Sequence, residues 1–161
     1  MSSSLSSIWR PSSARTVVLD SFVPVPRGST AVAPAPLNWP TKDPHDVLDY
    51  QLDIGPAVVG NAADNIVNLS ATVVPNSPGD LVINGTAIDG TSAILWLAGG
   101  HAGTVYTVTL LVSTTNGRVI QRSILLPVLE LSVPSVPQNA IQTSAGFVLT
   151  DQNGNPILAS P

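Results

Sequence analysis

The stretch from residue 105 to residue 126 constrains the fold more than any other part of the chain. Residues 105–114 (VYTVTLLVST) and 118–126 (RVIQRSILL) each alternate apolar and polar side chains, and Asn116-Gly117 lies between them. A two-residue period is typical of a strand with one buried face, and Asn-Gly between two such strands is the strongest short signal for a β-hairpin. The pattern predicts a long hairpin, with Asn116 and Gly117 in its turn and almost no chemically reactive side chain.

Shorter strands are predicted before this hairpin. Residues 47–54 and 66–74 alternate in the same way, and residues 81–88 and 92–97 are two further predicted strands. Turns rich in Asn, Asp, Pro and Gly separate these segments. No segment shows a 3.6-residue period over three helical turns. Short strands with a turn signal about every 8–12 residues are typical of a β-sandwich. We therefore predict an all-β fold, an immunoglobulin-like antiparallel β-sandwich over residues 47–131.

Two aromatic residues receive structural roles in this sandwich. The segment HAGTVYTV (101–108) is similar to the start of strand F of an immunoglobulin domain, where a tyrosine forms a corner. Tyr106 is therefore expected to hydrogen-bond back to the preceding loop. Trp96 is expected to be the core tryptophan, and the disulfide of that fold is impossible because the chain has no cysteine.

The segments on either side of the predicted sandwich differ from it in composition. Residues 1–46 are rich in proline and serine, which favours extended backbone, yet large apolar residues interrupt them. We predict an extended N-terminal arm with four anchors that are buried against a neighbouring subunit: Ile8, Trp9, Phe22 and Trp39. The alternative is that part of the arm packs on its own domain. Residues 132–161 predict a linker and a C-terminal β-hairpin around DQNGNP (151–156), which would add to another sheet because a lone hairpin is marginally stable.

Composition excludes several classes of function. Of 161 residues only 10% are charged, against roughly 25% in an average domain, and the net charge is −4. Without a basic stripe, nucleic-acid binding is not expected. No apolar run approaches the roughly 18 residues needed to cross a bilayer, so no membrane contact is expected, and the N-terminal sequence does not resemble a signal peptide. We expect a protein that is made in a cytoplasm and is not exported by the usual route.

The two histidines do not indicate catalysis or metal binding. His101 lies in the loop GGHAG (99–103) without an obvious acidic partner, and a hydrolase would need Ser or Asp within about 3 Å of its ring. His45 lies near Asp43, Asp46 and Asp49, which together could hold a cation, although capping of a turn is the favoured interpretation. We therefore predict no enzymatic activity, no catalytic residue, no bound metal and no cofactor.

Two motifs resemble a known family. LNWPTKDPHDVLDYQLDI (37–54) resembles the Trp-Pro-x-Lys-Asp-Pro-x-x-Val-Leu-Asp-Tyr segment that precedes the sandwich of phage fiber-tail adaptor proteins, and residues 96–128 resemble their shared loop and hairpin. The resemblance implies a structural virion protein of a tailed phage, synthesised in the host cytoplasm. It implies a role in joining tail fibres to the tail, in several copies around the tail axis. It also implies contacts with tail tube, adaptor or nozzle proteins and with the fibre protein, and no enzymatic activity.

The residues leave one further function open. An immunoglobulin-like binding module could recognise a glycan or protein on the host surface, with exposed tryptophans that stack on sugars. In the assembly interpretation the arm instead adds strands to sheet edges of adjacent subunits. Deletion of residues 1–40 is then expected to leave the sandwich folded while it prevents incorporation into particles.

Overall fold

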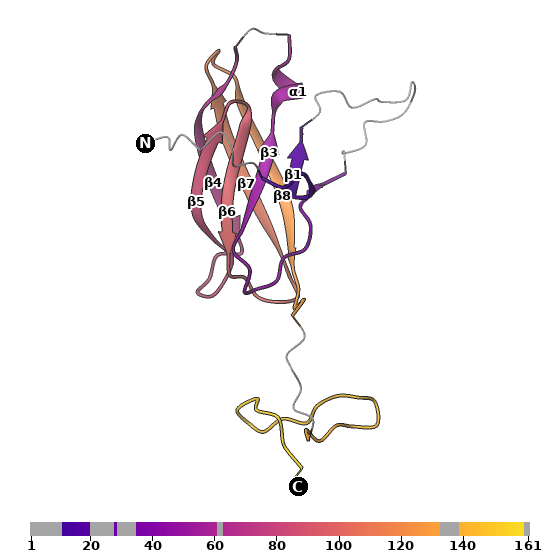
Figure 1. Ribbon diagram of the computed structural model, residues 1–161. Coiled ribbons are helices and arrows are strands. Elements are labelled where there is room, and N and C mark those ends of the chain that lie inside the picture. The colour runs from indigo at the N-terminus through magenta and orange to yellow at the C-terminus, as the bar shows by residue number, and fades with distance from the viewer. Residues whose placement is uncertain (1–10, 20–27, 29–34, 61–62, 133–138, 160–161) are drawn as a thin grey trace. The chain divides into compact units, whose positions relative to one another are not determined.

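Eight strands form the framework of the first of two compact units, Met1–Leu131 and Ser132–Pro161. The computed structural model describes residues 11–19, 28, 35–60, 63–132 and 139–159. In chain order the elements are η1 (Ser13–Arg15), β1 (Thr16–Val18), β2 (Leu37–Asn38), β3 (Leu48–Asp53), α1 (Gly55–Val58), β4 (Ile66–Val74), β5 (Val82–Asp89), β6 (Ser92–Ala98), β7 (Thr104–Thr114) and β8 (Val119–Val128) (Figure 1). None of the helices in these described ranges has the length and apolar character needed to cross a bilayer.

The strands form two four-stranded sheets that pack face to face, which confirms the predicted all-β sandwich. One sheet has the order β1-β3-β6-β5 and the other the order β2-β8-β7-β4 (Figure 1). These orders match the A-B-E-D and G-F-C arrangement of immunoglobulin constant-type domains, with β2 added beside the last strand. The prediction of a wholly antiparallel sandwich is wrong at the edges, because β1 pairs with β3 and β2 pairs with β8 in parallel.

Alternation along β7 builds the centre of the core. Tyr106, Val108, Leu110 and Val112 are all 0% exposed, while the residues between them face outward. Ten residue pairs join β7 to β8, so the predicted hairpin is the longest pairing in the described fold. At its tip Gly117 has a φ of +82°, and its N–H donates to the Thr114 carbonyl at 3.0 Å. The turn therefore spans Thr115 and Asn116, and Gly117 takes the left-handed position that follows it.

The core tryptophan is Trp39 rather than Trp96. Trp39 is 2% exposed, and its ring lies 5.1 Å from that of Tyr50 at an angle of 51°. Its backbone N–H bonds to Leu125 of one sheet, while its indole Nε1 donates to the carbonyl of Gln51 in the other sheet at 3.2 Å. Trp96 is only half-buried on β6. Trp39 thus closes one side of the sandwich between the two sheets.

Parts of the predicted arm are edge strands of their own domain. Both β1 and β2 lie within residues 1–46, so the predicted boundary between residues 46 and 47 does not separate an arm from the sandwich. Arg15 fixes this segment, because its Nε and Nη2 donate to the carbonyl and the carboxylate of Asp49, both at 2.7 Å. Of the two alternatives for the arm, packing on its own domain holds for residues 11–19 and 35–46.

The second unit contains short, irregular β-structure instead of one hairpin. Three isolated antiparallel bridges join Gln142 to Val148, Thr150 to Pro156, and Ala140 to Leu158. The predicted turn at 151–156 is one of two similar turns, and the other spans residues 143–146. The unit is drawn at the yellow end of the chain in Figure 1.

Candidate functional site

The segment between β2 and β3 ties the N-terminal part of the chain to the end of β8. The backbone N–H of Lys42 donates to the Pro127 carbonyl at 3.0 Å, and the N–H of Leu129 donates to the Lys42 carbonyl at 3.0 Å. A parallel bridge pairs Lys42 with Val128. The parallel pairing that β2 begins therefore continues past the end of that strand, through the motif that resembles the adaptor proteins.

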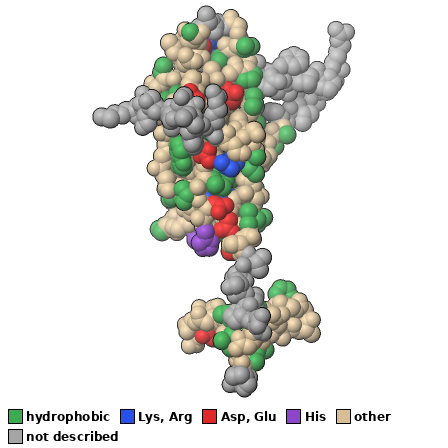
Figure 2. Space-filling view, viewed as in Figure 1, with side chains coloured by type: hydrophobic (Ala, Val, Ile, Leu, Met, Phe, Trp, Pro, Cys, Tyr) green, Lys and Arg blue, Asp and Glu red, His purple; other side chains and the backbone are tan. Residues whose placement is uncertain are grey.

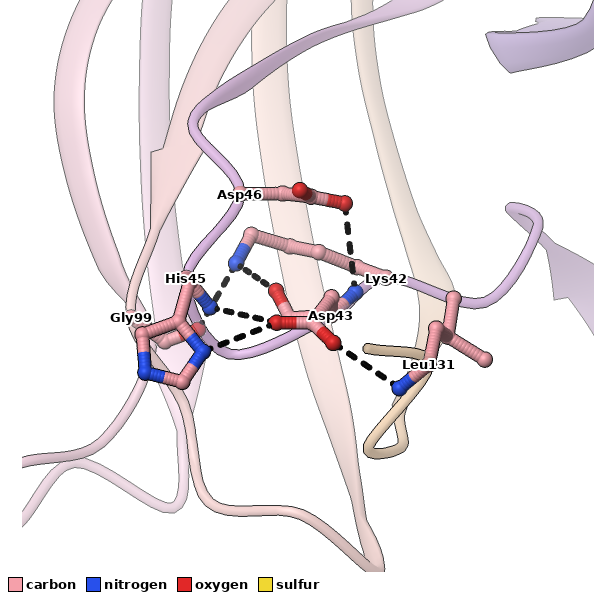
Figure 3. Close-up of polar contacts among 6 residues, drawn as sticks. All are labelled: Lys42, Asp43, His45, Asp46, Gly99 and Leu131. Carbon is pink, nitrogen blue, oxygen red and sulfur yellow. Dashed lines mark hydrogen bonds and ion pairs between the residues drawn. The ribbon is translucent and has the colours of Figure 1, made fainter. Parts of the chain in front are cut away.

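The side chain of Lys42 is buried in this segment. It is 0% exposed, and its Nζ donates to the backbone carbonyls of Asp43 at 2.7 Å and Gly99 at 2.9 Å (Figure 3). Burial lowers the pKa of Lys42, and the nearby charges of Asp46 and Asp43 oppose this shift. The ammonium group joins the β6–β7 loop to the turn that precedes β3.

The carboxylate of Asp43 holds the last residue of the first unit. One oxygen accepts a hydrogen bond from the backbone N–H of His45 at 2.9 Å, and the same oxygen lies 3.0 Å from the Nδ1 atom of the His45 ring. The other oxygen accepts from the N–H of Leu131 at 2.8 Å (Figure 3). Asp46 adds a 3.4 Å bond from the Asp43 N–H. We call Lys42, Asp43, His45, Asp46, Gly99 and Leu131 the exit clasp, because Leu131 ends the first compact unit.

Two residues of the exit clasp, together with Glu130, form a group of potential metal ligands among the described residues. Ligand atoms of Asp43, His45 and Glu130 all lie within 4.8 Å of one another. Asp49, which the sequence places near His45, instead binds Arg15. Both oxygens of Asp43 already accept hydrogen bonds from N–H groups, so the observed arrangement is that of a turn cap. Sequence reasoning missed Glu130 and Leu131 because they lie almost ninety residues away along the chain.

A second buried polar cluster surrounds Tyr106. Its phenol oxygen accepts a hydrogen bond from the N–H of His101 at 2.8 Å, and its O–H donates to Asp80 at 2.7 Å. The bond from Tyr106 and another from the Ser77 N–H hold the pKa of Asp80 below its usual value, against the effect of burial. Burial and the Asp80 contact raise the pKa of Tyr106. The Tyr106 side chain thus joins the β6–β7 loop to the turn before β5.

The same cluster bears on the hydrolase interpretation of His101. Its Nε2 lies 3.8 Å from the Asp80 carboxylate, and its side chain is 62% exposed. The contact is longer than the hydrogen bond that orients a catalytic base. The Asp80 carboxylate already accepts hydrogen bonds from the Tyr106 hydroxyl and the Ser77 N–H, so its role is to fix the turn before β5 against Tyr106.

A third cluster holds the tip of the β7–β8 hairpin. Asp64 is 3% exposed, accepts a hydrogen bond from the Asn116 N–H at 3.0 Å and binds the guanidinium of Arg118. Burial alone would raise the pKa of Asp64, but the bonds from Asn116, Thr114 and Arg118 outweigh it and lower that pKa. Asp64 thus fixes the turn at Asn116, one of the two residues of the sequence signal, and at Arg118 just after it.

The predicted partner-binding anchors have different outcomes. Ile8, Trp9 and Phe22 lie outside the described residues. Trp39 is 2% exposed and lies in the core of its own domain. The predicted burial of Trp39 against a neighbouring subunit is therefore replaced by burial between the two sheets of its own sandwich.

Comparisons with known proteins give one family. The family model described as "Podophage GP4 fiber-tail adaptor protein gp77" matches residues 42–127, just over half of the 161 residues. The match begins at Lys42 of the exit clasp and ends within β8, so it spans most of the sandwich. No curated protein matches the chain.

Proposed function

The chain belongs to the podophage GP4 fiber-tail adaptor family, and from this premise we propose that it joins tail fibres to the virion tail as a structural protein. Several copies of the chain contact tail proteins, the fibre protein and one another around the tail axis. The role includes no catalytic step.

The observation that carries this proposal is the division into two compact units, Met1–Leu131 and Ser132–Pro161. A joint needs at least two binding surfaces that can engage different partners. The sandwich offers one rigid body, and the exit clasp fixes the point at which the chain leaves it. The second unit offers a separate surface, on which five large apolar side chains are exposed: Ile141, Phe147, Leu149, Ile157 and Leu158.

The surface of the sandwich supports assembly with other proteins. Most of the face drawn in Figure 2 consists of uncharged polar side chains and backbone, with apolar side chains between them. Among the described residues each sheet has one long edge strand, β5 in one sheet and β4 in the other, that lacks a neighbour on one side. Both edges carry exposed valines, at Val67 and Val74 on β4 and at Val82 on β5. Open edges of this kind can accept a strand from another chain.

The proposal is tested in phage that cannot make this chain. Particles produced from an amber allele of its gene are expected to assemble tails that lack fibres, as seen by electron microscopy and mass spectrometry of purified particles. Supply of the full chain in trans is expected to restore the fibres, and so is supply of the Val119→Ser control variant, which alters one exposed side chain. Fibres at normal occupancy on particles without the chain would refute the proposal.

A further inference from the structure

The second unit repeats a short pattern, an aliphatic residue followed five positions later by glycine, every eight residues. Residues 141–148 (IQTSAGFV), 149–156 (LTDQNGNP) and 157–159 (ILA) align so that Ile141, Leu149 and Ile157 occupy equivalent positions. The repeats also align Gly146 with Gly154, which have φ values of +84° and +81°. A left-handed glycine therefore closes the turn of each complete repeat.

The backbone turns this repeat into a closed ring. The N–H of Leu149 donates to the Ile141 carbonyl at 2.9 Å, and the N–H of Ile157 donates to the Leu149 carbonyl at 2.8 Å. The N–H of Ile141 in turn donates to the Ile157 carbonyl at 2.8 Å. Each of the three equivalent residues thus donates to one of the others and accepts from the remaining one, which is the pattern of a threefold axis.

An outer set of contacts follows the same pseudo-threefold pattern. We call each turn outside the ring a lobe. Two lobes are closed by backbone hydrogen bonds, in which the N–H of Thr143 donates to the Phe147 carbonyl and the N–H of Asp151 donates to the Asn155 carbonyl, both at 2.8 Å. In each of these lobes a side-chain oxygen of the first residue also accepts from the backbone N–H of the second. The third lobe is closed by the two ends of the unit, since the N–H of Ala159 donates to the Asn139 carbonyl at 2.7 Å. The three isolated bridges are spaced by the same eight residues.

The unit is too small to cover its own apolar side chains. None of residues 139–159 is buried, and Phe147 is 72% exposed. The only charged side chain in this range is Asp151, whose carboxylate accepts hydrogen bonds from Asn153 and Asn155. A segment of roughly this size is rarely stable alone without disulfides, metal or association with another chain. A partner that covers it would therefore present an apolar, uncharged surface.

We infer that the second unit docks on the threefold axis of a homotrimer and contacts its three subunits through three equivalent lobes. This inference rests on the proposed function, in which the fibre protein is the partner. A homotrimer presents three identical surfaces around its axis. A single chain on that axis can match all three surfaces only if it repeats one surface three times. The eight-residue repeat and the ring of hydrogen bonds provide this repetition within one chain.

The test uses the full chain and the purified fibre protein of the same phage. Native mass spectrometry is expected to give one copy of the chain for every three fibre subunits. The single variants Ile141→Ser, Leu149→Ser and Ile157→Ser are each expected to weaken fibre binding by about tenfold or more, and by similar factors, because the three positions are equivalent. Val119→Ser, at an exposed position of the sandwich, is the matched control and is expected to bind normally.

A second set of variants separates docking from folding of the unit. Gln142→Arg, Thr150→Arg and Leu158→Arg place a charge on equivalent exposed positions, without changing the residues of the hydrogen-bonded ring. Slow amide exchange of residues 141, 149 and 157 shows that the ring persists in each variant. With the ring intact, similar losses of binding in all three variants support the inference.

Several results would overturn the inference. These are a stoichiometry other than one to three, a loss confined to one lobe, and normal fibre binding by all six variants. In each of these cases the chain still binds the fibre, so the proposed function stands. A full chain that does not bind the fibre at all refutes both.

Discussion

Tyr50 and Tyr106 are both 0% exposed, yet their hydroxyl groups have different surroundings. The Tyr106 hydroxyl lies between Asp80 and the His101 N–H. The Tyr50 hydroxyl is the one buried side-chain polar atom in the described residues that has no hydrogen-bond partner. Burial raises the pKa of Tyr50 to about 12, so this group stays neutral. A buried hydroxyl without a partner costs free energy, whereas one that joins two groups stabilises the fold.

Replacement of each tyrosine by phenylalanine should therefore give opposite results. Tyr106→Phe is expected to lower the free energy of unfolding by about 1–3 kcal/mol, because Asp80 and the His101 N–H lose a partner. Tyr50→Phe is expected to leave that free energy unchanged or to raise it by up to about 1 kcal/mol. Urea denaturation of the two variants beside the wild type measures both values. Equal losses in the two variants would contradict the contrast.

Acid should weaken the fold partly through Asp80. Hydrogen bonds from Tyr106 and Ser77 hold its pKa below the ordinary value, and the charge of His101 acts in the same direction. The folded carboxylate therefore releases its proton more readily than the same group in the unfolded chain. This stabilisation is complete above the unfolded pKa of about 3.9 and is lost as the pH falls through the lower folded value.

The corresponding measurement is the free energy of unfolding in urea between about pH 6 and pH 2. It is expected to fall with decreasing pH in the wild type. In Asp80→Asn the free energy of unfolding is expected to be lower at neutral pH, because a neutral amide accepts weaker hydrogen bonds from Tyr106 and Ser77 than a carboxylate does. It is also expected to fall less steeply in acid. An unchanged slope in this variant would show that Asp80 does not contribute.

Among the elements, β1 and β2 contribute more to the sandwich than their short lengths suggest. They cover the edges of β3 and β8, and Trp39 follows β2 directly into the core. The truncation that was expected to leave the sandwich folded therefore removes two of its strands and a core side chain. Removal of residues 1–40 is expected to lower the free energy of unfolding by at least about 3 kcal/mol, the usual cost of deleting a buried tryptophan side chain.

Trp39→Ala in the full chain is the companion variant for this truncation. It is expected to lose about 3–5 kcal/mol, since the edge strands remain but the core contact with Tyr50 is gone. Thermal or urea unfolding of both proteins gives the comparison. A truncated chain with the melting temperature of the full chain would mean that β1, β2 and Trp39 are dispensable.

The sequence predicted the six longer strands well and missed the two short edge strands, β1 and β2. Apolar and polar residues alternate along β7 and β8 because one face of each strand is buried, and this two-residue period can be recognised in the sequence. The edge strands β1 and β2 span only three and two residues, too short for any period to appear. Their parallel pairing depends on partners far along the chain, as does the bond between Asp43 and Leu131. By contrast, the eight-residue repeat was visible in the sequence, and alignment of Gly146 with Gly154 could have found it.

For the whole molecule, the scarcity of charge decides how its contacts respond to salt. Only 10% of the residues are charged, and the net charge is −4. Contacts formed mainly by apolar and uncharged polar groups are little affected by ionic screening, whereas exposed ion pairs weaken as the Debye length shortens. The chain is therefore expected to stay on purified particles in NaCl from about 0.05 M to about 1 M. Steep release over this range, followed by immunoblotting of washed particles, would point to ionic contacts instead.

The exit clasp also determines how tension enters the sandwich. A pull on Ser132 first meets the Leu131–Asp43 bond and the Leu129–Lys42 pair, which belong to the segment after β2. Beyond them the pull reaches β8, which ten residue pairs join to β7. Force that arrives at the C-terminal end of the sandwich is thus shared between β8 and the segment that follows β2, more than eighty residues earlier in the sequence.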